Sequence, residues 1–102
     1  GAWFDESRAS ELALRLEQHP LTIRQQQALL AAYGYDLSIT GLEDERSQLA
    51  VRAFQMHFRP ASYSGFFDNE STARLISLLE RYRPGVLASL DVFPKALHTP
   101  KQ

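Results

Sequence analysis

Apolar residues recur at helical spacing in four stretches of the chain, and the first lies near its start. One helical face, at positions i, i+3, i+4 and i+7, consists of Ala9, Leu12, Ala13 and Leu16. Acidic and capping residues precede this stretch, and Pro20 follows it directly after His19. The pattern therefore predicts a helix over residues 6–18 that ends at His19.

The second stretch begins with a capping box. Thr22 is placed to accept a hydrogen bond from the backbone N–H three residues on, while Gln25 reaches back to the N–H of Thr22. The face that follows consists of Gln26, Leu29, Leu30 and Tyr33, and Gly34 stands where a positive φ is favoured. We expect a short helix over residues 23–33.

The third stretch follows an acidic run, residues 43–45, which favours the start of a helix through the helix dipole. We interpret these three carboxylates as solvated charges. The broad face of the predicted helix holds Arg46, Ala50, Ala53, Phe54 and Phe58, and its alanines and phenylalanines are expected to pack in the core. Pro60 disfavours helical geometry at Arg59, so the helix should end there.

The fourth stretch is capped by Asp68 or Asn69. Its apolar face consists of Leu75, Ile76, Leu79 and Tyr82, and Pro84-Gly85 is expected to end the helix. A weaker apolar segment, residues 86–93, predicts a short docked helix before a frayed polar tail. Residues 35–39 alternate in polarity and could pair briefly with residues 63–67. The sum is a small all-helical domain with loops rather than strands.

Composition limits the classes of partner. The chain has 102 residues, 44% of them hydrophobic, and its eleven basic and twelve acidic residues leave a net charge of −1. This balance makes nucleic acid and anionic membrane surfaces unlikely partners, and no stretch predicts a membrane span. Cysteine is absent, which excludes thiolate sites and leaves the redox compartment open. Because the chain starts at Gly1 and its only methionine is Met56, we expect a processed product, a cloned fragment or a proteolytic remnant.

No catalytic or metal-binding constellation emerges from the residues. His19, His57 and His98 are isolated from one another, and no serine lies in a Gly-x-Ser-x-Gly elbow. His57 is expected to face water on the third helix. The residues therefore predict that this stretch of chain has no catalytic activity, no metal ligands and no cofactor of its own.

Aromatic residues suggest binding instead. Two loops contain or adjoin Tyr33, Tyr35, Tyr63, Phe66 and Phe67. Tyrosine offers an apolar ring with a polar tip, which suits sugars and peptides. We expect Tyr33 and Phe66 to cover the core, and Tyr35 and Tyr63 to be exposed. The candidate ligand-binding residues of the two loops are Tyr35, Asp36, Arg59, Tyr63, Gly65 and Phe66.

Three segments in order, LLAAYGYD, AVRAFQMHFRP and YSGFFDNESTARLISLLERY, resemble the peptidoglycan-binding domain appended to bacterial cell-wall hydrolases. Their firmest points are Tyr33-Gly34-Tyr35 and Phe54-Gln55. The resemblance implies an all-α fold, a small orthogonal three-helix bundle, here with an additional N-terminal helix and a C-terminal extension. It also implies that Gln55 is a structural hydrogen-bonding residue that braces the loop.

A narrower resemblance concerns residues 54–60 and the opening GAWFDE. Both are similar to zinc-dependent N-acetylmuramoyl-L-alanine amidases of the amidase-2 type. This resemblance implies that residues 1–20 are the end of a catalytic domain or a connector helix, residues 21–83 the binding domain, and residues 84–102 a partly flexible extension. The zinc would belong to the parent catalytic domain.

Two functions are expected from these resemblances and patterns. The first is a non-catalytic module that targets a bacterial amidase to peptidoglycan, through its glycan strand and stem peptide, in the cell envelope, either periplasmic or associated with the outer membrane. The alternative is a helical interaction or oligomerisation module. It would pack the apolar chain ends, residues 3–4 and 86–93, against the upstream catalytic domain or another subunit of a homo-oligomer.

Overall fold

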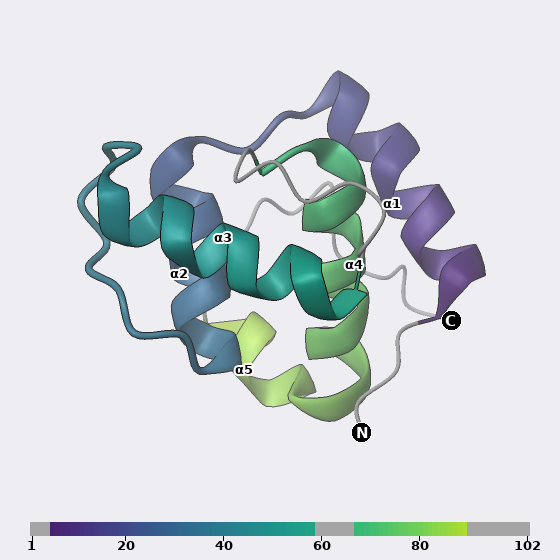
Figure 1. The fold of residues 1–102 in the computed structure, drawn as a ribbon. Coiled ribbons are helices and arrows are strands. Elements are labelled where there is room, and N and C mark those ends of the chain that lie inside the picture. Colours follow the sequence, from purple (N-terminus) through teal and green to yellow (C-terminus); the bar gives the residue numbers. More distant parts are fainter. Residues whose placement is uncertain (1–4, 59–66, 90–102) are drawn as a thin grey trace.

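Local capping interactions set the bounds of the helices in the computed structural model, which describes residues 5–58 and 67–89, without the side chains of residues 88 and 89. In these ranges the helices are α1 (Glu6–Gln18), α2 (Ile23–Tyr33), α3 (Glu45–Phe58), α4 (Asn69–Tyr82) and α5 (Pro84–Ser89), and there is no strand (Figure 1). The all-helical fold predicted from the sequence is confirmed. Residues 35–39 are not assigned to a strand, and most of the segment with which they were suggested to pair, residues 63–66, lies outside the described residues.

The predicted helix caps are present. The Asp5 side chain accepts a hydrogen bond from the backbone N–H of Arg8 at the start of α1, and His19 is the C-cap. Both hydrogen bonds of the capping box between Thr22 and Gln25 are present at the start of α2. Gly34 has a φ of 123°, a conformation that other residues rarely adopt, and it ends this helix.

Two details at helix ends differ from expectation. Asp44 is not simply a solvated charge, because its side chain accepts a hydrogen bond of 2.9 Å from the backbone N–H of Ser47 and caps α3. Pro84 does not only follow α4. It begins α5, where proline loses no hydrogen bond because the first N–H groups of a helix have no partner within it. The rest of the predicted segment 86–93, beyond Ser89, lies outside the described residues.

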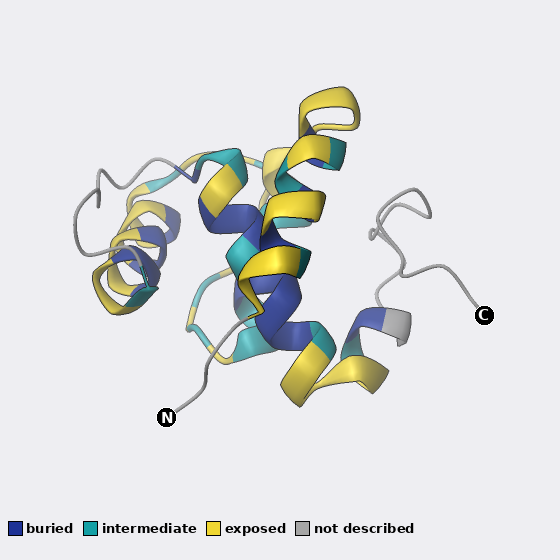
Figure 2. Ribbon diagram, turned by 90° about the vertical axis from the view of Figure 1, so that its right-hand side faces the viewer, coloured by how far each residue is buried: buried dark blue, intermediate teal, exposed yellow. Residues whose placement is uncertain are grey.

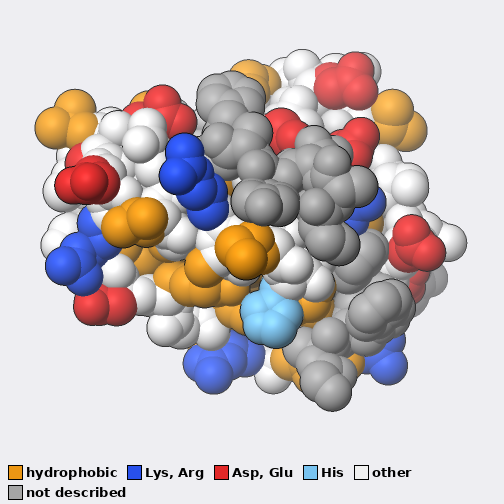
Figure 3. Space-filling model, in the orientation of Figure 1, with side chains coloured by type: hydrophobic (Ala, Val, Ile, Leu, Met, Phe, Trp, Pro, Cys, Tyr) orange, Lys and Arg blue, Asp and Glu red, His pale blue; other side chains and the backbone are white. Residues whose placement is uncertain are grey.

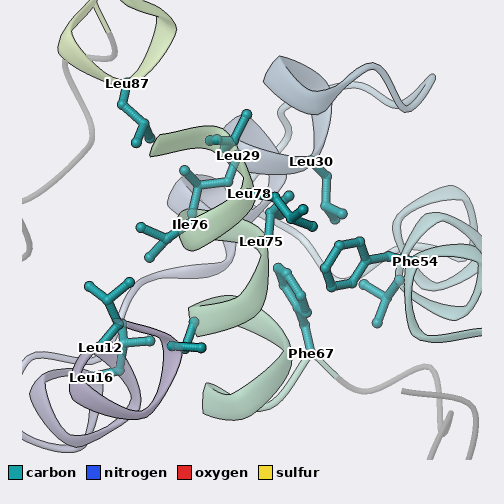
Figure 4. Packing of buried hydrophobic residues seen from close by; sticks show 14 of the residues in the cluster. Leu12, Leu16, Leu29, Leu30, Phe54, Phe67, Leu75, Ile76, Leu78 and Leu87 are labelled. Atoms are coloured by element: carbon teal, nitrogen blue, oxygen red, sulfur yellow. The ribbon is translucent and has the colours of Figure 1, made fainter. Parts of the chain in front are cut away.

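α4 is the central helix of the described bundle. It contacts α1, α2, α3 and α5, and Figure 1 shows α1 on one side of it and α2 and α3 on the other. Leucines from three of these neighbours converge on its apolar residues in Figure 4. Exposed positions gather on the outward surfaces of the helices (Figure 2). The fully buried aliphatic side chains of the core are Leu12, Leu16, Leu29, Leu30, Leu75, Ile76, Leu78 and Leu79.

α1 is joined to α4 by polar as well as apolar contacts. The Arg8 guanidinium forms two parallel hydrogen bonds to the Glu80 carboxylate, Nε to Oε1 at 2.9 Å and Nη2 to Oε2 at 2.7 Å. These bonds raise the pKa of Arg8 above its ordinary value, although burial opposes the rise. The Ser77 hydroxyl accepts a hydrogen bond from the backbone N–H of Asp5 at 3.1 Å. α1 therefore shares one core with the other helices, while the predicted domain boundaries at residues 20 and 83 stay predictions.

The inward face of α3 consists partly of other residues than the sequence suggested. Phe54 is fully buried and Ala50 nearly so, as expected. Arg46 and Ala53, however, are exposed. The buried face also includes Ser47, Val51 and Gln55, and this places position 53 on the outer side of the helix. His57 is exposed, as predicted.

Gln55 is a structural hydrogen-bonding residue, as the family resemblance implied, while its role in bracing the loop stays a prediction. Its side chain is completely buried, and its Nε2 donates a hydrogen bond of 3.1 Å to the Ser71 hydroxyl in the first turn of α4. A buried amide needs such partners, because leaving it unpaired costs about 1–3 kcal/mol. This bond aligns α3 with α4.

A second buried amide, Gln27, holds the loop between α2 and α3. Its Oε1 accepts hydrogen bonds from the backbone N–H groups of Thr40 at 2.9 Å and Gly41 at 2.8 Å. Its Nε2 donates to the carbonyl of Leu42 at 2.7 Å and to the Ser47 hydroxyl at 2.6 Å. One side chain thus connects α2, the loop and the first turn of α3. The sequence did not single out Gln27, since one glutamine in a run of three gives no sign of burial.

The shared core predicts unequal effects of two leucine substitutions in α1. Leu12 is fully buried, whereas 66% of Leu14 is exposed. We expect Leu12→Ala to lower the free energy of unfolding by about 2–5 kcal/mol, because it opens a cavity beside α4. Leu14→Ala is the matched control and should change it by less than about 0.5 kcal/mol. Urea denaturation measures both, and a similarly small effect of the two would mean that α1 does not share the core.

The Gln27 contacts predict a local as well as a global effect of Gln27→Leu. The change removes the side-chain partner of two backbone N–H groups, and it leaves the Leu42 carbonyl with only the Thr40 hydroxyl. We therefore expect a loss of about 2–4 kcal/mol in the free energy of unfolding. Hydrogen exchange at the N–H groups of Thr40 and Gly41 should also accelerate. Gln18→Leu, at an exposed position of α1, is the control. Unchanged exchange at Thr40 and Gly41 would contradict the proposed role.

Candidate functional site

Two of the six predicted ligand-binding residues lie in the described part of the chain. Tyr35 and Asp36 follow α2 directly, at the start of the loop that Gln27 holds. Arg59, Tyr63, Gly65 and Phe66 lie outside the described residues. The site can therefore be built from the loop between α2 and α3 and from the helices beside it.

An aromatic cluster lies beside the start of this loop. The rings of Tyr33 and Tyr35 are stacked, with centroids 6.0 Å apart and an angle of 24° between their planes. Both rings meet the buried ring of Phe54 edge to face, at 6.4 and 6.5 Å. Phe54 also contacts Phe58 and Phe67. Tyr35 is therefore partly buried rather than exposed as expected, because one side of its ring belongs to the cluster.

The environment of the two tyrosines keeps their hydroxyls protonated. Burial raises the pKa of the Tyr33 and Tyr35 phenols above their ordinary value. At neutral pH each hydroxyl is therefore a neutral group that can both donate and accept a hydrogen bond. An apolar ring with such a tip can lie against a sugar or peptide and bond to it at one edge.

A hollow with charged sides lies next to Tyr35, between the loop and the first half of α3. We call it the Tyr35 hollow, and it is lined by Tyr35, Asp36, Glu45, Arg46, Leu49 and Ala50. Arg46 Nη1 lies 3.0 Å from Asp36 Oδ2, and both side chains are largely exposed. Such an exposed ion pair adds little to stability, so its groups are available to a ligand. Near the start of α3, Figure 3 shows acidic and basic groups around exposed hydrophobic side chains.

A smaller opening lies between α2 and α3 on another side of the same loop. We call it the α2–α3 slot. Its cavity volume is about 20 Å³, and its lining is mainly apolar. The residues that line it are Ile23, Gln26, Gln27, Leu30, Glu43, Ser47, Gln48, Val51 and Phe67. None of these was among the six candidate residues, although Phe67 was one of the five aromatic residues noted in or beside the loops.

A third hollow separates α1 from the outer face of α4. Its sides include the exposed Leu14 and the pair formed by Arg74 and Glu70, whose charged atoms are 3.6 Å apart. This hollow adjoins neither the aromatic cluster nor the loop between α2 and α3. It therefore contributes nothing to the predicted site.

Neither a cluster of metal ligands nor a membrane-spanning helix is found in the described part of the chain. In residues 5–58 and 67–89, no three histidine, cysteine or carboxylate side chains come together as metal ligands. These residues do not fit the zinc that the amidase resemblance implies for a parent catalytic domain. Of the described helices, none has the length and apolar character needed to cross a bilayer.

Comparison with known proteins assigns the family. Residues 21–75 match the family model described as "Putative peptidoglycan binding domain". This range begins just before α2 and ends within α4, so it contains the Tyr35 hollow and the α2–α3 slot.

One similar protein is named as an amidase, and another is known from a crystal structure. The N-acetylmuramoyl-L-alanine amidase AmiD of Escherichia coli (strain K12) is 42% identical over 85 residues, which are 80% of this chain and 30% of the relative. A crystal structure of AmpDH3 from Pseudomonas aeruginosa superposes with a TM-score of 0.67 at 40% identity, covering 80% of this chain and 32% of that one. The chain thus spans about a third of the length of either relative. Its match over more than half of its own residues shows that the chain belongs to the peptidoglycan-binding domain family.

Proposed function

We propose that this chain is the non-catalytic wall-binding module of a bacterial N-acetylmuramoyl-L-alanine amidase, and that it holds the enzyme on peptidoglycan. The observation that carries the proposal is the family match over residues 21–75. The 42% identity to an E. coli protein named as such an amidase supports the choice of parent enzyme. On this proposal the hydrolysed bond and the zinc both belong to a catalytic domain elsewhere in the protein.

The Tyr35 hollow is the surface that we propose for the wall polymer. The exposed side of the Tyr35 ring offers an apolar face to a sugar ring. Asp36 and Arg46 offer a carboxylate and a guanidinium, which suit the charged ends of a stem peptide. A ligand with both sugar and peptide parts could use all three groups.

Such a module increases activity without contributing a catalytic group. Binding one part of an insoluble polymer keeps the linked catalytic domain close to further scissile bonds, at a high effective concentration. Each contact can therefore be weak and still be useful. This role places the protein in the bacterial cell envelope, in the periplasm or at the outer membrane.

A second candidate function is an interaction or oligomerisation module. Three large apolar side chains seven residues apart, Leu42, Leu49 and Met56, are 69%, 59% and 60% exposed. Figure 3 shows hydrophobic groups exposed along this face of the molecule. Leu49 and Met56 lie on α3 and Leu42 lies in the loop before it, and an exposed apolar surface of this kind is typical of protein contacts. Its partner would be the upstream catalytic domain or a second copy of the chain.

Sedimentation with insoluble peptidoglycan tests the first function. We expect the chain to move from the supernatant to the pellet as polymer is added, because a wall-binding module needs no catalytic domain to bind. Crystalline cellulose is the control polymer. Protein that stays in the supernatant at every polymer load would disprove the proposal.

Two pairs of variants test the Tyr35 hollow. Tyr35→Leu keeps apolar packing but removes the ring and hydroxyl, so we expect about threefold to tenfold weaker binding to peptidoglycan. Tyr82→Leu, at the exposed end of α4, is its control. Asp36→Asn should also weaken binding, whereas Glu17→Gln on the exposed side of α1 should not. Equal binding by each variant and its control would show that the ligand binds elsewhere than in the Tyr35 hollow, and it would leave the proposed wall-binding function standing.

Light scattering at high protein concentration separates the two functions. A wall-binding module is expected to be a monomer. Self-association through α3 should instead give a larger mass, and Leu49→Glu and Met56→Glu should each reduce this mass to that of one chain. Arg52→Glu, at another exposed position of α3, is the charge-changing control. A mass of one chain at every concentration would contradict self-association through α3.

A further inference from the structure

The α2–α3 slot has the size of one small group and an apolar floor. Leu30, Val51 and Phe67 form this floor, and each is at most 7% exposed. The cavity volume of about 20 Å³ exceeds the roughly 10–15 Å³ that a single water needs. The side chains of the floor offer no hydrogen-bond partner to a water, which needs polar groups on several sides. The cavity is suited to a methyl group.

The walls of the slot are fixed before any ligand arrives. Gln27 and Ser47 line it, and they are hydrogen-bonded to each other at 2.6 Å. Gln27 is bonded at the same time to the loop, through Thr40, Gly41 and Leu42. A site held in this way loses little conformational freedom on binding, which favours even a small ligand group.

The rim of the slot offers amide groups on both sides. Gln26 Nε2 donates a hydrogen bond of 3.2 Å to the carbonyl of Phe67, and its Oε1 accepts none from the described residues. On the facing helix, the exposed Gln48 has a side-chain amide that is not bonded to the described part of the chain. Among the described residues, the rim therefore presents an acceptor from α2 that is not hydrogen-bonded, and both a donor and an acceptor from α3.

The charge at the slot limits the ligand further. Glu43 is the one charged side chain among the described residues of the lining, and it is exposed. No described lysine or arginine lines the slot to bind a carboxylate, and Glu43 repels one. A neutral group is favoured over the acidic ends of a stem peptide.

We propose that the α2–α3 slot binds the acetamido group of an N-acetylated amino sugar. The methyl group lies on the floor of Leu30, Val51 and Phe67. The amide N–H donates to Gln26 Oε1, and the carbonyl accepts from Gln48 Nε2. This inference rests on the proposed function, and it names the glycan strand as the part of the wall that this slot recognises.

A titration with defined oligosaccharides tests the slot directly. The chain is observed by methyl and amide NMR while N-acetylglucosamine tetramer is added. Cellotetraose is the comparison, because it has the same linkage and no charge but carries a hydroxyl in place of each acetamido group. We expect the methyl signals of Leu30 and Val51 to shift with the acetylated tetramer and to stay in place with cellotetraose.

Two substitutions locate the binding. Gln48→Ala removes the proposed donor at an exposed position, so we expect about threefold to tenfold weaker binding of the acetylated tetramer. Gln18→Ala on α1 is the matched control and should bind as the unaltered chain does. Val51→Leu places an extra methylene at the floor and should abolish the shift of Leu30. Its fold is checked by the amide spectrum.

The outcomes separate this inference from the proposed function. Equal shifts with both tetramers, full affinity of Gln48→Ala, or a response only to an N-acetylated alanyl dipeptide would overturn the slot assignment. If the unaltered chain still sediments with peptidoglycan in any of these cases, the wall-binding function stands. Conversely, a chain that binds the acetylated tetramer in the slot but does not sediment with peptidoglycan would support the slot and overturn the function.

Discussion

Burial of α4 on almost every side is the constraint on which the described structure depends. Eight of its fourteen residues are buried, whereas a helix at a protein surface normally buries one stripe. Such a helix is stable only when neighbours cover its whole circumference, and α1, α2, α3 and α5 each contact it. α1 is therefore part of the core although it precedes the range matched by the family model. Its Leu12 and Leu16 close a side of α4 that the other helices leave open.

Polar groups on α4 decide how its neighbours are aligned. The Ser71 hydroxyl accepts from Gln55 of α3, and the Ser77 hydroxyl meets the backbone of Asp5 at the start of α1. Apolar surfaces alone would tolerate small shifts between helices, because hydrophobic attraction has no direction. A shift that breaks one of these bonds leaves a buried polar group unpaired, at a cost of about 1–3 kcal/mol. The buried hydroxyls thus select one arrangement among many that would bury similar area.

Buried polar groups also hold the two proposed ligand surfaces in place. Gln27 is buried in α2 and bonds to the loop and to α3, and the loop has the Tyr35 hollow near its start and the α2–α3 slot near its end. Both openings are therefore held by groups that serve the fold. The residues around both openings are already ordered in the folded chain, so little conformational entropy is lost when a ligand binds. This favours the binding of a weakly interacting polymer.

The helices and most of their ends could be predicted from the sequence alone. The bounds of α1 and α2 agree with the predicted residues, because capping by Asp5, Thr22 and Gln25 involves neighbours in the chain. Family membership could also be predicted, because the motifs around Tyr33 and Phe54 are continuous in sequence. The position of Pro84 was partly misjudged because proline both ends one helix and begins another.

Burial on the broad helical faces and the hollows of the surface depend on contacts between elements that lie apart in the sequence. Helical spacing assigned Ala53 to the core, yet contacts with α2 and α4 selected Ser47 and Gln55 instead. Tyr35 was expected to be exposed, and stacking on Tyr33 made it half-buried. Burial of a polar side chain depends on partners supplied by other elements, and periodicity along one element carries no information about them.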